Sequence, residues 1–416
     1  TLTGDKTLTV NTAGTTLFND TVNIAQLTTD TPGAVQINAA TVTTSGTQTY
    51  NDPITLLSNT VLSSTGAAAL GNISFNSTIS GAKTLAVNTA GTTLFNDNVN
   101  IAQLTTDAPG AVQINAATVT TSGTQTYNDP ITLLSNTVIS STGAAALGNI
   151  SFNNTLTGDK TLTVNTAGTT LFDKAVSVGQ LTTDAPGFVQ INAPTVATTG
   201  SQTYNDALTL LSDTTMTSAG VAAAGNISFM KTMDGAKTLA VNTAGTTLFN
   251  DTVNIAQLTT DTPGFVQINA PTVATSGTQI YNDPMTLLAN TVLSSTGVAA
   301  AGNISFNNTL SGDKTLTVNT AGTTLFDKAV SIGQLTTDAP GLVQINAPTV
   351  ATTGSQTFND ALTLLSDTTM TSAGVAAAGN ISFMKTMDGA KTLAVNTAGT
   401  TLFNDTVNIA QLTTDA

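Results

Sequence analysis

Residues 84–107 read TLAVNTAGTTLFNDNVNIAQLTTD, and residues 392–415 repeat this stretch with Thr406 in place of Asn98. The central octet NTAGTTLF recurs with a constant period of 77 and without any insertion or deletion, starting at Asn11, Asn88, Asn165, Asn242, Asn319 and Asn396. A fixed period is the signature of a repeat protein, in which each unit packs on its neighbours.

This period divides the whole chain. We predict one continuous repeat body over residues 1–416, with full units at 15–91, 92–168, 169–245, 246–322 and 323–399 and partial units at 1–14 and 400–416. Because both ends fall inside a repeat, we expect the chain to be a segment of a longer protein.

The composition favours an all-β structure. Only 8% of the 416 residues are charged, all 24 acidic residues are Asp and all 10 basic residues are Lys. Glu and Arg, which favour helices, are absent, whereas Thr, Val, Ile, Asn and Gly favour strands and tight turns. A hydrophobic content of 40% supplies enough core for a folded chain.

Charge and hydropathy exclude two classes of partner. The net charge of −14 repels nucleic acid and anionic membranes, and no Arg is present to hold a phosphate in a bidentate contact. No apolar run reaches the length of about 18 residues that a membrane-spanning helix needs, so membrane insertion is not expected. The lack of Cys excludes disulfides and thiolate metal sites.

Each unit divides further into four segments of similar length, of which the last is one residue longer than the others. In the first unit they are TTLFNDTVNIAQLTTDTPG (15–33), AVQINAATVTTSGTQTYND (34–52), PITLLSNTVLSSTGAAALG (53–71) and NISFNSTISGAKTLAVNTAG (72–91). Apolar residues alternate within each segment, which indicates short strands with one buried face. Three short strands in about 19 residues match one coil of a parallel β-helix, so we predict a right-handed parallel β-solenoid with four coils per repeat.

Equivalent positions should stack in such a solenoid. The fourth position of each segment gives a predicted core column of Phe18, Ile37, Leu56 and Phe75, and Phe75 should meet Phe95 as Phe152 meets Phe172. Asn19, Asn38 and Asn76 at the fifth position are predicted to form amide ladders. The closing residues Gly33, Asp52, Gly71 and Gly91 are types that tolerate the left-handed backbone of a sharp corner.

A second architecture also fits the strand pattern. Strands with turns every roughly 8–12 residues are compatible with a small antiparallel sandwich in each repeat unit. The four-fold subdivision and the lack of a linker between units favour the solenoid.

The run GxxTLxVNTAGTT, followed by TSGTQTYND and GNISF, resembles the repeat region of large exported bacterial proteins of the filamentous haemagglutinin type. The resemblance covers essentially the whole chain. It implies a right-handed parallel β-helix that forms a long surface fibre or adhesin stalk, and hence an extracellular or cell-surface location.

The carboxylates allow two kinds of chemical site. An enzyme is not expected, because every Asp-bearing motif recurs and a catalytic site needs one unequal pocket; no cofactor is predicted. Asp30, Asp107, Asp184, Asp261 and Asp338 sit in TDxPG corners, where calcium is one interpretation and turn formation the better one. Asp20 and Asp52 would pair only if two corners aligned.

The aromatic columns allow a third kind of site. Phe18, Phe95 and Phe172, with Tyr50, Tyr127, Tyr204 and Tyr281, would form a sugar-binding strip if they were exposed, but their alternation favours a core role for Phe. For Tyr50 the hydroxyl group is expected to reach water.

A second periodicity favours a mechanical role. Residues 155–260 and 309–414 match almost throughout at an offset of 154, which indicates a duplication of two units. We therefore expect a fibre body or adhesin stalk whose partners are adjoining repeats, further copies of itself, or a host or neighbouring-cell surface. The alternatives are an adhesin that binds glycan or protein through a side face, and a self-assembling polymer subunit.

Overall fold

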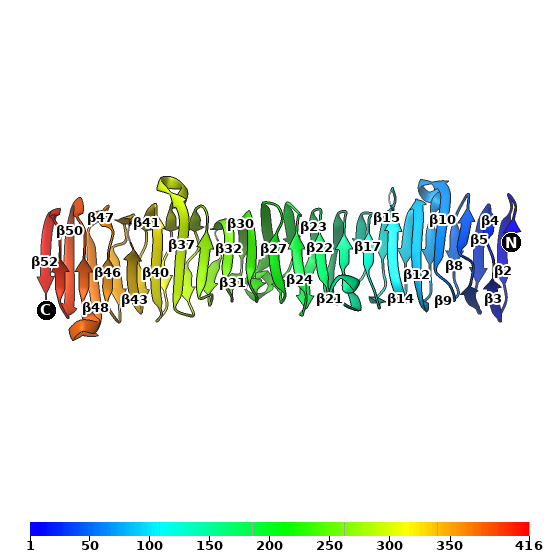
Figure 1. Ribbon diagram of the computed structural model, residues 1–416, viewed down its shortest axis with the longest axis horizontal. Coiled ribbons are helices and arrows are strands. Elements are labelled where there is room, and N and C mark those ends of the chain that lie inside the picture. The colour runs from blue at the N-terminus through cyan, green and yellow to red at the C-terminus, as the bar shows by residue number, and fades with distance from the viewer. Residues whose placement is uncertain (108, 185, 262, 339, 416) are drawn as a thin grey trace. The chain divides into compact units, whose positions relative to one another are not determined.

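The computed structural model describes residues 1–107, 109–184, 186–261, 263–338 and 340–415. Ala416, the end of the last predicted partial unit, lies outside the described residues, as does the third residue of four TDxPG corners. The chain divides into two compact units, Thr1–Ala207 (unit 1) and Leu208–Ala416 (unit 2). Each unit is a stack of short parallel strands, which Figure 1 shows side by side within the unit.

The strands of unit 1 are β1 (Leu2–Thr3), β2 (Thr7–Asn11), β3 (Thr15–Phe18), β4 (Val22–Ile24), β5 (Gln26–Asp30), β6 (Ala34–Ile37), β7 (Thr41–Thr44), β8 (Gln48–Tyr50), β9 (Ile54–Leu56), β10 (Thr60–Ala67), β11 (Ile73–Phe75), β12 (Ile79–Ala90), β13 (Thr92–Phe95), β14 (Val99–Asp107), β15 (Ala111–Ile114), β16 (Thr118–Thr121), β17 (Gln125–Tyr127), β18 (Ile131–Leu133), β19 (Thr137–Ala144), β20 (Ile150–Phe152), β21 (Leu156–Ala167), β22 (Thr169–Phe172), β23 (Val176–Asp184), β24 (Phe188–Ile191), β25 (Thr195–Thr198) and β26 (Gln202–Tyr204).

The strands of unit 2 begin with β27 (Ala207–Leu210), whose first residue closes unit 1, and continue with β28 (Thr214–Val221), β29 (Ile227–Phe229), β30 (Met233–Ala244), β31 (Thr246–Phe249), β32 (Val253–Asp261), β33 (Phe265–Ile268), β34 (Thr272–Thr275), β35 (Gln279–Tyr281), β36 (Met285–Leu287), β37 (Thr291–Val298), β38 (Ile304–Phe306), β39 (Leu310–Ser311), β40 (Thr315–Ala321), β41 (Thr323–Phe326), β42 (Val330–Ile332), β43 (Gln334–Asp338), β44 (Leu342–Ile345), β45 (Thr349–Thr352), β46 (Gln356–Phe358), β47 (Ala361–Leu364), β48 (Thr368–Val375), β49 (Ile381–Phe383), β50 (Met387–Ala398), β51 (Thr401–Phe403) and β52 (Val407–Asp415).

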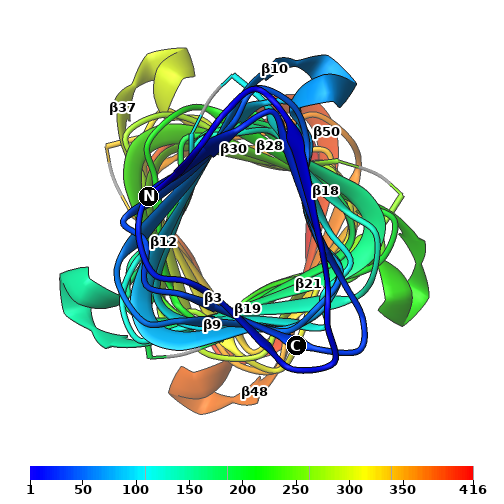
Figure 2. The same cartoon turned by 90° about the vertical axis from the view of Figure 1, so that its right-hand side faces the viewer.

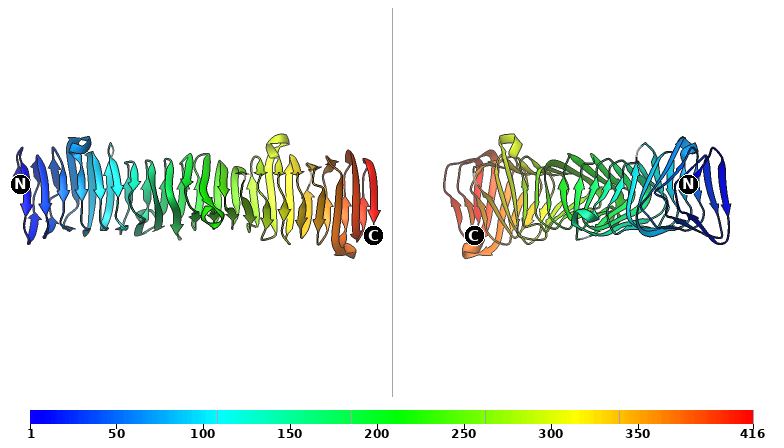
Figure 3. Two further views of the ribbon diagram at one scale, coloured as in Figure 1. Left: turned by 180° about the vertical axis from the view of Figure 1, so that it is seen from behind. Right: turned by 45° about the vertical axis from the view of Figure 1, so that its right-hand side comes forward.

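The described residues contain no α-helix. One short 3₁₀ segment follows the longest strand of the third segment in every repeat: η1 (Ala68–Gly71), η2 (Ala145–Gly148), η3 (Ala222–Gly225), η4 (Ala299–Gly302) and η5 (Ala376–Gly379). Figure 3 shows these segments projecting from the stacked strands.

The strands of each unit pair into three parallel ladders, which are the three faces of the solenoid (Figure 2). In unit 2 the first ladder contains β27, β34, β37, β40, β43, β46, β49, β51 and the starts of β30 and β32. The second contains β28, β35, β38, β41, β44, β47, the ends of β30 and β32 and the starts of β50 and β52. The third contains β29, β31, β33, β36, β39, β42, β45, β48 and the ends of β50 and β52.

Unit 1 has the same arrangement of three parallel ladders, in which a strand pairs with the strand one coil further on. The all-β parallel solenoid is therefore confirmed. Phe18 pairs with Ile37 and Val22 with Val42, so most coils are of nearly equal length. Ile54 pairs with Ile79, which marks one longer coil in the repeat.

The number of coils per repeat corrects the prediction of four. Residues 246–322 contain the ten strands β31–β40. Because the two ends of β32 belong to different ladders, β32 counts as two strand segments, and the repeat has eleven strand segments in all. With three segments per coil, a repeat contains three coils and two further strands. The longer coil is the one that contains the projecting 3₁₀ segment.

The predicted core column is wrong after Leu56, where the longer coil begins. Phe18 aligns with Ile37, and Ile37 with Leu56, but Phe75 does not continue this column. Its ring stacks on Tyr50 at a centroid distance of 5.6 Å and on Phe95 at 5.3 Å. Phe152 and Phe172 stack at 5.3 Å as well. All of these side chains are buried.

Close packing of the backbone requires glycine at these corners. Gly33, Gly71 and Gly91 do not adopt a positive φ, so the predicted left-handed conformation is wrong for them. A Cβ atom on Gly33 would lie 2.4 Å from the carbonyl oxygen of Thr12, and one on Gly91 would lie 2.5 Å from that of Ala68. Asp52 closes its corner as a buried side chain, again without a positive φ.

Amide ladders form at the corners, although not with every predicted partner. The Asn38 Nδ2 group donates to Asn19 Oδ1 at 2.9 Å. Asn76 Nδ2 donates instead to Asn51 Oδ1 at 2.7 Å, because β11 stacks on β8. These bonds satisfy amide groups that the corners leave beside one another.

A buried polar network crosses the core once in every repeat. The Tyr50 hydroxyl is fully buried and donates to Gln48 Oε1 at 2.9 Å, so the expectation that it reaches water is wrong. The Gln48 Nε2 group lies within hydrogen-bonding distance of Val42 O and Ser63 O. In the last repeat Phe358 replaces Tyr, and Gln356 Oε1 has no hydrogen-bond partner among the described residues.

We expect Phe358→Tyr to stabilise unit 2, because its hydroxyl would satisfy the buried oxygen of Gln356. The free energy of unfolding should rise by about 1 kcal/mol, measured by urea unfolding monitored with far-UV circular dichroism. The matched control is Tyr281→Phe, which removes the donor to Gln279 Oε1 and should cost roughly 1–3 kcal/mol. An unchanged or lower stability of Phe358→Tyr would show that the hydroxyl does not reach the amide.

Candidate functional site

The carboxylates are distributed over different corners. Asp20 follows the end of β3, whereas Asp52 precedes the start of β9, and β3 and β9 belong to one ladder of parallel strands. The two side chains therefore lie at opposite ends of the same face and do not pair. Asp20 is exposed, while Asp52 is buried.

Asp52 and its equivalents share a corner with the Asp of the TDxPG motif, because β8 stacks on β5. Gly187 N donates to Asp206 Oδ1 at 2.7 Å, and Gly341 N donates to Asp360 Oδ1 at the same distance. Burial raises the pKa of Asp129, Asp206, Asp283 and Asp360, and the neighbouring TDxPG carboxylate adds to the rise.

These corners bring together two carboxylates and no more. Within the described ranges, no group of three or more His, Cys, Asp or Glu side chains is placed to hold a metal ion. The predicted Asp30, Asp107, Asp184, Asp261 and Asp338 are half-buried or exposed beside the proline turn. At Asp206, Asp283 and Asp360 a glycine N–H binds the buried carboxylate, which makes this arrangement a turn-forming one.

The Lys side chains that form ion pairs do so with their sequence neighbours. Asp159 and Lys160 lie 3.0 Å apart, as do Asp173 and Lys174, and the pairs at Asp313 and Asp327 repeat this arrangement. The neighbouring Lys holds the pKa of Asp159, Asp313 and Asp327 below the usual range, with an added contribution from the Asn346 amide at Asp327. At Asp173 the Asn192 amide lowers the pKa most and Lys174 adds to it. Exposed pairs of this kind contribute little to stability.

The predicted aromatic strip is not on the surface. Phe18, Phe95, Phe172 and the four Tyr side chains are all buried. Two other phenylalanines are exposed, Phe188 by 60% and Phe265 by 58%. Both occupy the first position of the second segment, where earlier repeats carry Ala34 and Ala111.

The η segments form an exposed apolar projection, which we call the knob. In η1 the knob comprises Ala67, Ala68, Ala69 and Leu70, all of them exposed, and Leu70 is exposed by 68%. In the later repeats Val221, Val298 and Val375 replace the first Ala and are exposed by 71–72%. Each knob is therefore a run of four exposed apolar residues between two glycines.

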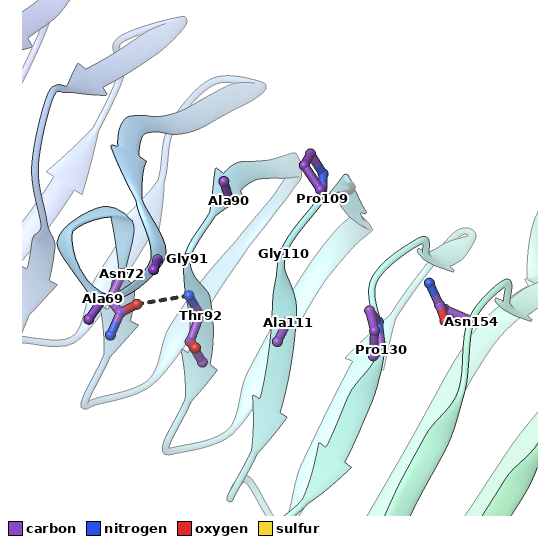
Figure 4. A pocket seen from close by; sticks show the side chains of 11 residues that line it. Ala69, Asn72, Ala90, Gly91, Thr92, Pro109, Gly110, Ala111, Pro130 and Asn154 are labelled. Atoms are coloured by element: carbon purple, nitrogen blue, oxygen red, sulfur yellow. Dashed lines mark hydrogen bonds between the residues drawn. The ribbon is translucent and has the colours of Figure 1, made fainter.

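A shallow groove begins at the knob and follows the same corner over the next coils (Figure 4). Behind η1 it has a volume of about 600 Å³, and its walls include Ala69, Ala90, Ala111 and the rings of Pro109 and Pro130. Asn72 closes one side, where its Oδ1 accepts a hydrogen bond from Thr92 N at 2.8 Å. The lining residues of this groove carry no charge.

Unit 2 repeats this groove two repeats further along the chain, with larger side chains. Behind η3 the lining consists of Val221, Ala244, Pro263, Gly264, Phe265, Pro284 and Asn308, around a volume of about 510 Å³. Val221 and Phe265 stand where unit 1 has Ala67 and Ala111. Behind η4 the corner is more polar, because Lys385 and Asp405 contribute to the lining of a further pocket with Pro340.

Sequence reasoning missed both the knob and the groove. The signal was the run GAAALG at residues 66–71, in which consecutive apolar residues break the alternation that marks the strands. The groove leaves no local signal, because its residues come from five successive coils.

No protein-family model, curated protein or solved structure matches the chain. The helical segments of the described ranges are too short to cross a membrane. What the structure establishes is a parallel β-solenoid with one knob per repeat and with apolar corner grooves behind η1 and η3.

Mild acidification is expected to stabilise the protein through the buried Asp row. Because the folded-state pKa of Asp129, Asp206, Asp283 and Asp360 is raised, their stabilising contribution is complete below the unfolded pKa of about 3.9. It is lost as the pH rises through the folded-state pKa. The urea midpoint should therefore be higher near pH 4 than at pH 7.

Replacing all four residues by Asn should flatten this dependence, because an amide does not titrate and at positions 206, 283 and 360 can still accept the glycine N–H. The matched control replaces Asp159, Asp173, Asp313 and Asp327 by Asn. Their pKa values are lowered, so their contribution is lost as the pH falls, and the control should keep the gain on acidification. Equal pH profiles for the two variants would contradict the assignment.

Proposed function

We propose that this chain is the structural repeat region of a secreted or cell-surface bacterial fibre, either a filament body or an adhesin stalk. The observation that carries the proposal is the uniform stack. Every repeat adds the same eleven strand segments, and within each unit successive coils pair through parallel ladders. A solenoid of this kind extends by repetition, because each coil needs only its two neighbours.

The bacterial and extracellular parts of the proposal come from the resemblance of the repeat sequence to filamentous haemagglutinin-type proteins. Three features support a mechanical role over an enzymatic one. The carboxylates recur at equivalent corners, the apolar corner groove behind η1 recurs behind η3 two repeats further on, and the internal duplication adds two whole repeats. Duplication of a spacer increases its reach, whereas a catalytic site gains little from it.

A binding role for the side face is the second candidate. The predicted aromatic rows do not favour it, because they are buried. The exposed Phe188 and Phe265 do favour it, since large exposed apolar side chains that group with others mark interaction sites.

The fibre proposal predicts that length follows repeat number. Deleting one unit, residues 246–322, removes eleven strand segments and should shorten the particle by roughly 18 Å at about 4.8 Å per coil, while the remaining strands pair as before. Negative-stain electron microscopy and small-angle scattering measure this length. The control deletes residues 265–270, which is less than one coil, and should lower the melting temperature sharply because the buried Val273 and Thr275 would then take outward positions in the ladder. A particle whose length does not change with the whole-unit deletion would contradict the proposal.

A further inference from the structure

We propose that copies of this chain associate side by side, with the apolar knob of one copy seated in the corner groove of another. The inference deepens the proposed fibre function, because a spacer that associates laterally forms bundles. Only the biological role of the contact rests on the proposed fibre function, because the contact itself depends on the knob and the groove alone.

Each knob exposes apolar surface that the single chain does not cover. Four consecutive exposed apolar residues project from every repeat, although the outward positions of the flanking strands are mostly polar. Exposed apolar runs of this length are unfavourable in a soluble surface unless they serve a contact.

The backbone of each knob is strained. Ala68, Ala145, Ala222, Ala299 and Ala376 begin the η segments with φ values of 48–51°, and they are the non-glycine residues with positive φ in the described part of the chain. A left-handed Ala costs about 1–2 kcal/mol, and glycine would avoid this cost. Strain that recurs in every repeat at an exposed tip indicates that the shape of the tip has a use.

The chemistry of the groove suits an aliphatic ligand. Asn308 Nδ2 donates to Asn282 O at 3.2 Å, and Asn308 Oδ1 accepts from Thr309 N at 2.9 Å. Asn72 is also engaged through its Oδ1 atom. With these amides already bonded and Pro263, Phe265 and Pro284 forming the walls, the groove suits small aliphatic side chains better than a sugar.

The charge distribution selects a second copy as the occupant. The chain carries a net charge of −14, so copies repel one another wherever carboxylates meet. The knobs and the linings of the grooves behind η1 and η3 contain no charged residue, so a contact there brings no like charges together. Knob and groove also occur on the same chain, so an identical partner offers both surfaces.

The arrangement of the knobs sets the geometry of the bundle. In unit 2, η3 connects the second ladder to the third, η4 the first to the second, and η5 the third to the first. Figure 2 accordingly shows η3 (green), η4 (yellow) and η5 (orange) projecting in three different directions. Unit 2 can therefore meet neighbours on three sides. A knob of four small residues is smaller than a stable interface of about 1,200 Å², so each contact is weak and several must act together.

The test is sedimentation velocity of the full 416-residue chain over roughly 10 to 500 μM, a range suited to weak contacts. Wild type should associate as concentration rises. The knob variant carries Asp in place of Leu70, Leu147, Val221, Val298 and Val375. Its association should weaken by at least about tenfold, as expected when several central contacts are lost.

The matched control carries Asp in place of Leu57, Leu134, Leu211, Leu288 and Leu365, which are exposed by 39–41% at another corner. It removes as many aliphatic side chains and adds the same charge, so it should associate like wild type. Far-UV circular dichroism and the melting temperature check that both variants fold. Neither variant alters the terminal coils, so association through chain ends would persist in both.

Disulfide trapping tests which surfaces meet, because the chain has no native Cys. An equimolar mixture of Ala223→Cys and Asn308→Cys copies should cross-link under mild oxidation faster than either variant alone. Faster cross-linking of Ala223→Cys alone would overturn the knob-in-groove contact.

Monomeric wild type at the highest concentration, or equal weakening in the knob variant and its control, would overturn the proposal. Knob-dependent flotation with phosphatidylcholine vesicles, in the absence of self-association, would also overturn it and assign the knob to a lipid surface. A monomer that is still elongated in scattering would leave the fibre proposal intact, whereas loss of elongation would refute that proposal separately.

Discussion

Parallel pairing between successive coils is the constraint on which the rest of the structure depends. A parallel ladder places each residue beside the residue one coil further on, about 4.8 Å away. Every buried position must therefore accept a similar neighbour, as Phe75 and Phe95 do with rings 6° from coplanar. The same spacing lets a corner amide bind the next one, as at Asn19 and Asn38. A sequence that satisfies this constraint once satisfies it again when repeated, which explains the near-identity of the units.

The strands and their buried faces followed from the sequence because they depend on local alternation. Phe18 and Ile37 are examples, since both lie in short alternating runs of equal spacing. Local alternation could not predict which strand stacks on β9 (Ile54–Leu56) in the next coil. Ile73–Phe75 and the strand that starts at Ile79 both alternate, and only the projection of residues 67–71 makes the later strand the one that stacks on β9.

Features that depend on contacts between distant chain segments could not be predicted from the sequence either. The sequence suggested that Gly33 is needed for a left-handed corner. The structure shows instead that only glycine fits there, because a carbonyl oxygen from the preceding coil occupies the place of a Cβ atom. The Tyr50 hydroxyl found a partner in Gln48, two residues away on the same buried face. The knob escaped detection because alanine, which prefers helices and avoids positive φ, gives no hint of an exposed left-handed turn.

The count of eleven strand segments per repeat links the fold to the proposed lateral association. Twelve segments would fill four coils, so that every knob would lie on one corner and the solenoid would be one-sided. Eleven segments leave each repeat one strand short, and the knob moves to another corner with each repeat, as η3, η4 and η5 do in unit 2. The duplicated block of two repeats holds twice eleven segments, which is not a multiple of three either. Lengthening the chain by this block therefore keeps the distribution of knobs over all three sides, as a laterally bundled fibre requires.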